Sequence, residues 1–180
     1  MDGCILNDTF HMALAFPMIS RTMYLQSLCN KYGDFRVAKS FVNKQGDTIW
    51  SKHRSVLQCW HSDFGLKFLA SANHRQILPV EIILDYDFKL SKLSMLLLKQ
   101  ELKNRGYGYK AYHTGSKGIH VHIIDISLAF MGRYQRELRR EEIIIQCGAE
   151  LMKKSDKCMI SLEKYAPHWK SGKMPTELRL

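Results

Sequence analysis

The stretch VEIILDY, residues 80–86, restricts the fold of this chain more than any other. A nearly continuous apolar run of this length, bounded by polar residues, is typical of a strand that is buried on both faces. The segment that follows, residues 90–104, carries Leu93, Leu96, Leu97 and Leu102 at spacings that favour a helix packed on a sheet. A buried strand followed by such a helix predicts a layered fold in which helices cover a sheet.

Alternating strand and helix patterns continue beyond this pair. We expect two strands joined by a GSKG loop, then a long charged helix, then a short last strand, at residues 109–114, 119–125, 134–153 and 158–163. The long helix would pack through Ile143, Ile144 and Leu151. The order β-α-β-β-α-β is that of the ferredoxin-like fold, in which helices lie on one side of a mostly antiparallel sheet.

The N-terminal part carries weaker signals. We expect a helix-like apolar stretch, a hairpin around the turn sequence NKQGD and a short helix, at residues 12–29, 43–47 and 63–75. No repeat or low-complexity linker divides the chain. The sequence therefore predicts an α+β protein with a ferredoxin/RRM-like core and an N-terminal α/β extension. Both belong to one domain of residues 1–180, with 1–75 as the extension and 76–180 as the motif-bearing core.

The charge of the chain suits an anionic partner. Its net charge is +10, and six basic residues face one acid, Glu101, between Phe88 and Lys110. Nucleic acid is the first candidate, and general solubility is the alternative explanation. The sequence has no apolar run of the ~18 residues that a membrane span needs and no secretory signal pattern. We expect an intracellular protein, cytoplasmic or nucleoid-associated, with no membrane partner.

Five cysteines lie far apart and form no CxxC pair, which argues against a disulfide framework. Cys59 and His61, with His53 and His74 nearby, offer the alternative of a zinc site. Clustered zinc-ligand spacings are absent, so no zinc is expected and buried free cysteines are the preferred interpretation.

Two carboxylates end the buried strand. Asp85 and Asp87 are two residues apart, so they project to the same side of a strand. Like charges held this close are stabilised by a divalent cation, and hard oxygen ligands suit Mg²⁺ or Mn²⁺. A solvated strand end, where aspartate is common, is the alternative.

A glycine-rich loop precedes the next strand but one. Gly115 and Gly118 flank Lys117, and backbone amides in such a loop can hold phosphate oxygens. His120 and His122 then share one strand face. An ordinary hairpin turn followed by exposed histidines would explain the same residues.

A third segment, APHWKSGK, adds His168 and Lys170 as donors and Trp169 as a stacking surface. A basic C-terminal loop is the simpler explanation of this segment alone. Together, paired acids, a Gly-Lys-His loop and a His-x-Lys loop are the inventory of a metal site beside a triphosphate pocket.

These segments resemble, in this order, the motifs of the archaeo-eukaryotic primase superfamily. ILDYD is similar to the strand that ends in DxD, TGSKGIH to the family's SGxRGxH, and MISLEKYAPHWKSG to its last conserved region. The resemblance runs from about Arg75 to the C-terminus. Lys117 stands where the family has arginine, and Thr114 where it has serine. Lysine keeps the charge but loses bidentate phosphate recognition. The segment between the first two motifs holds no cysteine, unlike the zinc-bearing insertion of cellular primases.

The resemblance implies a role for each matching residue. Asp85 and Asp87 would hold two catalytic Mg²⁺ or Mn²⁺ ions, and Glu150 would be the third carboxylate, with Asp156 as the alternative ligand. The incoming nucleotide would be bound by the remaining site residues: Arg75, Thr114, Ser116, Lys117, His120, His168 and Lys170.

The implied function is that of a DNA primase or primase-polymerase, which makes primers on single-stranded DNA from nucleoside triphosphates by two-metal nucleotidyl transfer. A second primase subunit or a replication protein is an expected partner. Three alternatives remain: a repair-type polymerase that extends existing ends, a degenerate nucleic-acid-binding module, and a metal-dependent nuclease.

Overall fold

A buried strand lies at one edge of the main sheet. The computed structural model describes residues 20–88, 90–113, 118–162 and 177–178. Strand β6 (Glu81–Tyr86) is buried at every residue, as the apolar run predicts. It pairs along its whole length with β8 (Ile119–Ile124), which pairs with β7 (Gly108–His113). The short β10 (Glu177–Leu178) completes the order β10-β7-β8-β6, and all pairs are antiparallel.

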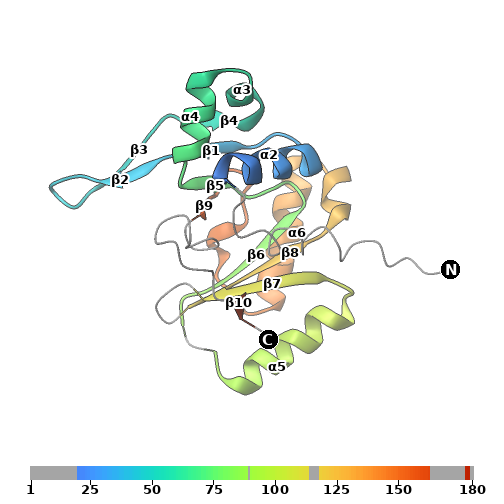
Figure 1. Cartoon of the computed structure of the whole chain (residues 1–180). Coiled ribbons are helices and arrows are strands. Elements are labelled where there is room, and N and C mark those ends of the chain that lie inside the picture. The colour runs from blue at the N-terminus through green and yellow to red at the C-terminus, as the bar shows by residue number, and fades with distance from the viewer. Residues whose placement is uncertain (1–19, 89, 114–117, 163–176, 179–180) are drawn as a thin grey trace.

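One face of this sheet packs against helices. Ile82, Leu84 and Tyr86 of β6 join Val121 and Ile123 of β8 in an apolar cluster with residues of two helices. These helices are α5 (Lys92–Asn104) and α6 (Arg133–Gln146). The α+β class with antiparallel sheets is therefore confirmed, and the helices of the core cover a sheet (Figure 1).

Helix α5 buries a different stripe from the one that its leucines suggested. Leu98 and Leu102 are buried, whereas Leu93, Leu96 and Leu97 are each more than 60% exposed. The prediction for these three leucines was wrong. With 3.6 residues per turn, Leu98 and Leu102 share one face, and the three exposed leucines lie on other sides.

Helix α6 ends at Gln146, seven residues before the predicted end at Lys153. Gly148 adopts a φ of 63°, a left-handed conformation that glycine adopts easily and that ends helices. The chain is then extended at Glu150, which caps a short 3₁₀ turn, η2 (Leu151–Lys153). Leu151 is 42% exposed, so it does not extend the apolar face of α6 as predicted.

A second sheet has the order β4-β1-β5-β9. Its strands are β1 (Arg36–Ala38), β4 (Arg54–Ser55), β5 (His74–Gln76) and β9 (Met159–Ser161). An apolar cluster joins this sheet to the N-terminal helices α2 (Arg21–Tyr32), α3 (Val56–Trp60) and α4 (Asp63–Ser71). The last predicted strand, β9, pairs with β5 of this second sheet and does not lie beside β6. The four strands of the predicted β-α-β-β-α-β order therefore do not share one sheet.

The predicted hairpin around NKQGD is confirmed. Strands β2 (Ser40–Val42) and β3 (Thr48–Trp50) pair antiparallel and extend away from the rest of the molecule (Figure 1). Within the part of the chain that the structure describes, no helix is long and apolar enough to cross a membrane. The four cysteines in that part are free.

The link between the two sheets is held by one buried arginine. Arg140 of α6 is fully buried and donates to the carbonyl oxygens of Leu78, Pro79 and Glu81 at 3.0, 3.1 and 2.8 Å. Its remaining nitrogen binds the carboxylate of Asp156. One side chain thus connects α6, the β5–β6 link and the segment that leads to β9.

Candidate active site

The face of the main sheet opposite α5 and α6 carries polar side chains. Because side chains alternate along strands, Glu81 and Asp85 of β6 share this face, and His120 and His122 of β8 share it as well. All four of these residues are buried. Buried ionisable groups need partners, and this face supplies them in two clusters.

The first cluster pairs Asp85 with His120. The two residues lie directly opposite each other in the β6–β8 ladder, and the Oδ1 atom of Asp85 lies 2.5 Å from Nε2 of His120. Both side chains are almost wholly shielded from solvent, at 6% and 4% exposure. The strand pairing therefore places the two groups side by side on one face of the sheet.

The second cluster is centred on Glu81. Its Oε1 atom lies 2.7 Å from Nδ1 of His122, and both of its oxygens accept hydrogen bonds from Arg75, at 2.7 and 2.9 Å. The amide of Leu78 adds a bond at 3.0 Å. Burial alone would raise the pKa of Glu81, but Arg75 and His122 hold that pKa far below its usual range. Glu81 is therefore ionised.

Burial lowers the pKa of His122, against the opposing influence of Glu81. The imidazole is therefore neutral at pH 7. Its proton is on Nδ1, which donates a hydrogen bond to the carboxylate of Glu81. The ring of Tyr112 meets that of His122 edge to face, with centroids 5.4 Å apart. The ring of His122, next to the Asp85–His120 pair, is thus held by Glu81 and Tyr112.

Glu150 lies beside Asp85. The amide of Glu150 donates to the carbonyl oxygen of Asp85 at 2.9 Å, which forms an isolated antiparallel bridge at the open edge of β6. Residues paired in this way present their side chains to the same face. Glu150 reaches this position from an extended segment, and not from the end of a helix as expected, because α6 ends four residues earlier. Asp87, directly after β6, is exposed.

Asp156 occupies a different environment. Its carboxylate binds Arg140 and accepts a bond of 2.6 Å from Arg136. Burial would raise the pKa of Asp156, but the hydrogen bonds from Arg136 and Arg140 lower it. Two guanidinium groups therefore compensate its charge, whereas Glu150 is paired with Asp85.

Arg75, predicted to bind the nucleotide, is buried, and its guanidinium donates hydrogen bonds to the carboxylate of Glu81. Several predicted site residues lie outside the described residues, namely Thr114, Ser116, Lys117, His168 and Lys170. Among the residues that the structure describes, no group of three or more His, Cys, Asp or Glu side chains is close enough to hold a metal ion.

Sequence reasoning missed Glu81 as part of this face. The available signal was a carboxylate inside an otherwise apolar strand, since a buried charge requires a partner. The partners come from two different sheets, Arg75 from β5 and His122 from β8, and no local pattern in the sequence connects them.

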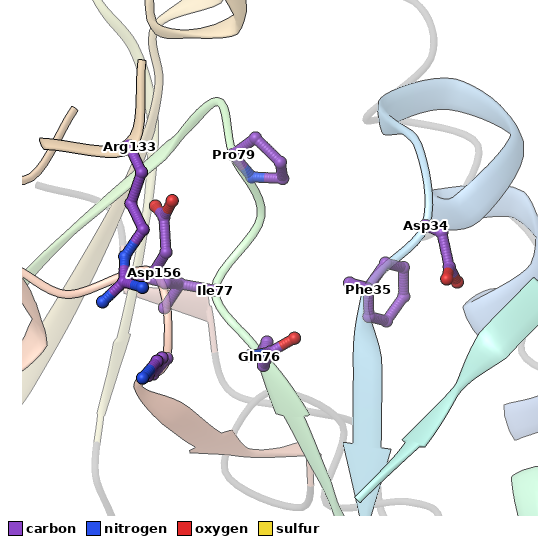
Figure 2. A pocket seen from close by; sticks show the side chains of 8 residues that line it. Asp34, Phe35, Gln76, Ile77, Pro79, Arg133 and Asp156 are labelled. Atoms are coloured by element: carbon purple, nitrogen blue, oxygen red, sulfur yellow. The ribbon is translucent and has the colours of Figure 1, made fainter. Parts of the chain in front are cut away.

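A separate cavity of about 200 Å³ lies at the link between β5 and β6. Figure 2 shows Arg133 and Asp156 on one side of it, Phe35 on the other, and Gln76, Ile77 and Pro79 between them. The carboxylate of Asp34, at its margin, accepts bonds from the hydroxyl of Ser55 and the amide of Leu57. Asp156 is the only predicted site residue among those that line this cavity.

No family model matches the chain, and neither a curated protein nor a solved structure matches it at a significant level.

Proposed function

We propose that the protein is a template-directed nucleotidyltransferase of the primase or primase-polymerase type, on a primase-like core in which three of the four ferredoxin-like strands, β6, β7 and β8, share one sheet. The observation that supports this proposal best is the convergence of Asp85 and Glu150 at the open edge of β6, with Asp87 exposed directly after that strand. Acids from two chain segments meet there, and Asp85 is oriented by an imidazole from the adjacent strand.

The acids suit divalent cations. Carboxylate oxygens are hard ligands of the kind that Mg²⁺ and Mn²⁺ prefer, and Asp85, Asp87 and Glu150 would provide them. Asp156 fits less well, since Arg136 and Arg140 already compensate its charge. When bound, the cations would lower the pKa of an attacking 3′-hydroxyl and neutralise charge on the triphosphate.

The chain's own groups would position the reactants. The resemblance assigns His120 to the triphosphate, and its contact with Asp85 adds a second task, which is to orient that carboxylate. Arg75 supports the site from behind: it keeps Glu81 ionised, and Glu81 in turn fixes the ring of His122. Thr114, Ser116, Lys117, His168 and Lys170 would bind the phosphates and supply positive charge.

The test is synthesis on a single-stranded DNA template with NTPs or dNTPs and Mg²⁺ or Mn²⁺, followed by sizing of the labelled products. We expect products without an added primer. Asp85→Asn and Asp87→Asn should each abolish synthesis, and Asp63→Asn, an exposed acid at the start of α4, should not. The Asp87 variant is informative even if Asp85→Asn disturbs the fold, since Asp87 is exposed.

Full activity in both variants would refute the proposed carboxylate site, and absence of product under every condition would refute the proposed activity. Extension of an annealed primer without any synthesis from template alone would instead identify a repair-type polymerase.

A further inference from the structure

The β2–β3 hairpin exposes apolar side chains on a ribbon that extends from the body of the protein (Figure 1). Phe41, Val42, Ile49 and Trp50 are 58%, 67%, 40% and 45% exposed. A two-stranded ribbon has little core of its own and is marginally stable alone. Exposed apolar residues gathered on such an element mark an interaction surface.

Trp50 is held in place although it is half exposed. Its ring meets the imidazole of His74 at a centroid distance of 4.7 Å and that of His53 at 6.2 Å, both edge to face. His74 belongs to β5 and contacts the side chain of Asn73 at 3.0 Å, so the tryptophan is anchored to the second sheet. A fixed aromatic face loses little conformational entropy when a planar group stacks on it.

The surroundings of the hairpin are basic. Residues 36–54 contain five Lys and Arg residues and a single acid, Asp47. The guanidinium of Arg54 lies 5.0 Å from the ring centre of Phe64, an aromatic residue that is itself 65% exposed. Lys44 and Lys52 are exposed. Cations next to exposed aromatic rings are the combination with which proteins bind single-stranded nucleic acids.

We propose that the basic surface around Trp50, defined by Lys44, Trp50, Lys52, Arg54 and Phe64, binds single-stranded nucleic acid, with an unpaired base stacked on Trp50. The positive charge of the surface complements the phosphates, and stacking on the exposed ring of Trp50 requires a base that is not paired. The inference rests on the proposed function only in taking the bound strand to be the template of nucleotidyl transfer.

The test is the fluorescence anisotropy of a labelled single-stranded DNA of mixed sequence, measured in EDTA without nucleotides. Trp50→Ala should weaken binding by roughly 5- to 150-fold, the range expected for loss of one base-stacking contact, and Trp50→Phe should retain most of the affinity. Lys44→Ala should reduce the slope of log K against log salt by about 0.7, the value for one single-strand phosphate.

Two matched variants control for non-specific effects. Phe130→Ala removes an aromatic residue that is 88% exposed, and Lys157→Ala removes an exposed cation, both outside the hairpin. Neither should change the affinity by more than about twofold, which is within the usual range for a surface substitution. Lys44 is exposed and lies in the turn of the hairpin, so its variant remains informative if Trp50→Ala fails to fold.

Normal affinity in Trp50→Ala and an unchanged salt slope in Lys44→Ala would overturn the proposal. Absence of DNA binding by the unmodified protein at low salt would also overturn it and would favour an acidic protein as the partner. Because the assay needs neither metal nor nucleotide, its result is independent of catalysis. DNA binding through the hairpin without synthesis would reject only the proposed function, and synthesis without a hairpin effect would reject only this inference.

Discussion

Substitution of Asp156 by asparagine tests whether this carboxylate stabilises the fold or takes part in catalysis. The carboxylate of Asp156 is the counter-ion of Arg140, whose side chain is fully buried. Asp156→Asn leaves that guanidinium without a compensating charge, and breaking a buried ion pair costs about 3–5 kcal/mol. Asp156 is 19% exposed, and asparagine still accepts hydrogen bonds, so we expect the lower end, about 3 kcal/mol.

The matched variant is Glu150→Gln. The contact of Glu150 with Asp85 runs through its backbone amide, which the substitution leaves intact. Its effect on the free energy of unfolding should stay within about 0.5 kcal/mol. If Glu150 is a metal ligand, as proposed, the variant should synthesise primers at least about 10²-fold more slowly than the unmodified protein. This is the size of effect seen when an electrostatic group of an active site is lost.

Urea denaturation followed by tryptophan fluorescence measures the first effect, and primer synthesis measures the second. For a chain of this length, about 3 kcal/mol corresponds to a melting temperature lower by roughly 6–12 °C. The reasoning fails if Asp156→Asn is as stable as the unmodified protein but inactive while Glu150→Gln is active. That pattern would make Asp156 the ligand.

Two further substitutions test the buried framework. Glu81→Gln leaves Arg75 without its counter-ion and should cost about 3–5 kcal/mol at pH 7. Because the pKa of Glu81 is lowered on folding, its contribution exists above its unfolded pKa of about 4.3 and is lost as the pH falls toward the folded value. The stability of Glu81→Gln should therefore depend less on pH in this acidic range, and equal slopes in urea titrations would contradict the argument. Gly65→Ala should cost about 1–3 kcal/mol, since its new Cβ would lie 2.1 Å from the carbonyl oxygen of Cys59. Gly108→Ala, which meets no atom within 4 Å, is the control, and similar melting temperatures for the two variants would refute the packing argument.

Periodicity in the sequence was sufficient to predict three strands of the main sheet, β6, β7 and β8, and its two helices, but not the short β10. It failed where several orientations satisfy the same pattern. Leu96, Leu97 and Leu98 are consecutive, so they cannot all face the sheet, and the structure buries only Leu98. Gly148 was the local signal for the early end of α6, but the apolar residues beyond it hid that signal.

Strand pairing was harder to predict than strand position. Nothing in residues 159–161 indicates that β9 pairs with β5, because the pattern of a strand reports which faces are buried and not which strand lies beside it. For the same reason, the sequence suggested that His120 and His122 share a face, but it could not identify their partners. Those partners, Asp85 and Glu81, become evident only from the register of β6 against β8.

The hydrogen bonds of Arg140 to the β5–β6 link restrict motion between the two sheets. A protein that closes around its substrate by rotating one half against the other must flex the peptide that joins the halves. Here the carbonyls of Leu78, Pro79 and Glu81 are held by a single guanidinium that is itself anchored in α6. The joint between the sheets is therefore stiff, and the two sheets should move as one rigid block. The proposed binding of a nucleic-acid strand would then require movement only outside this block, such as in the turn of the protruding β2–β3 ribbon, since Trp50 is held against the second sheet.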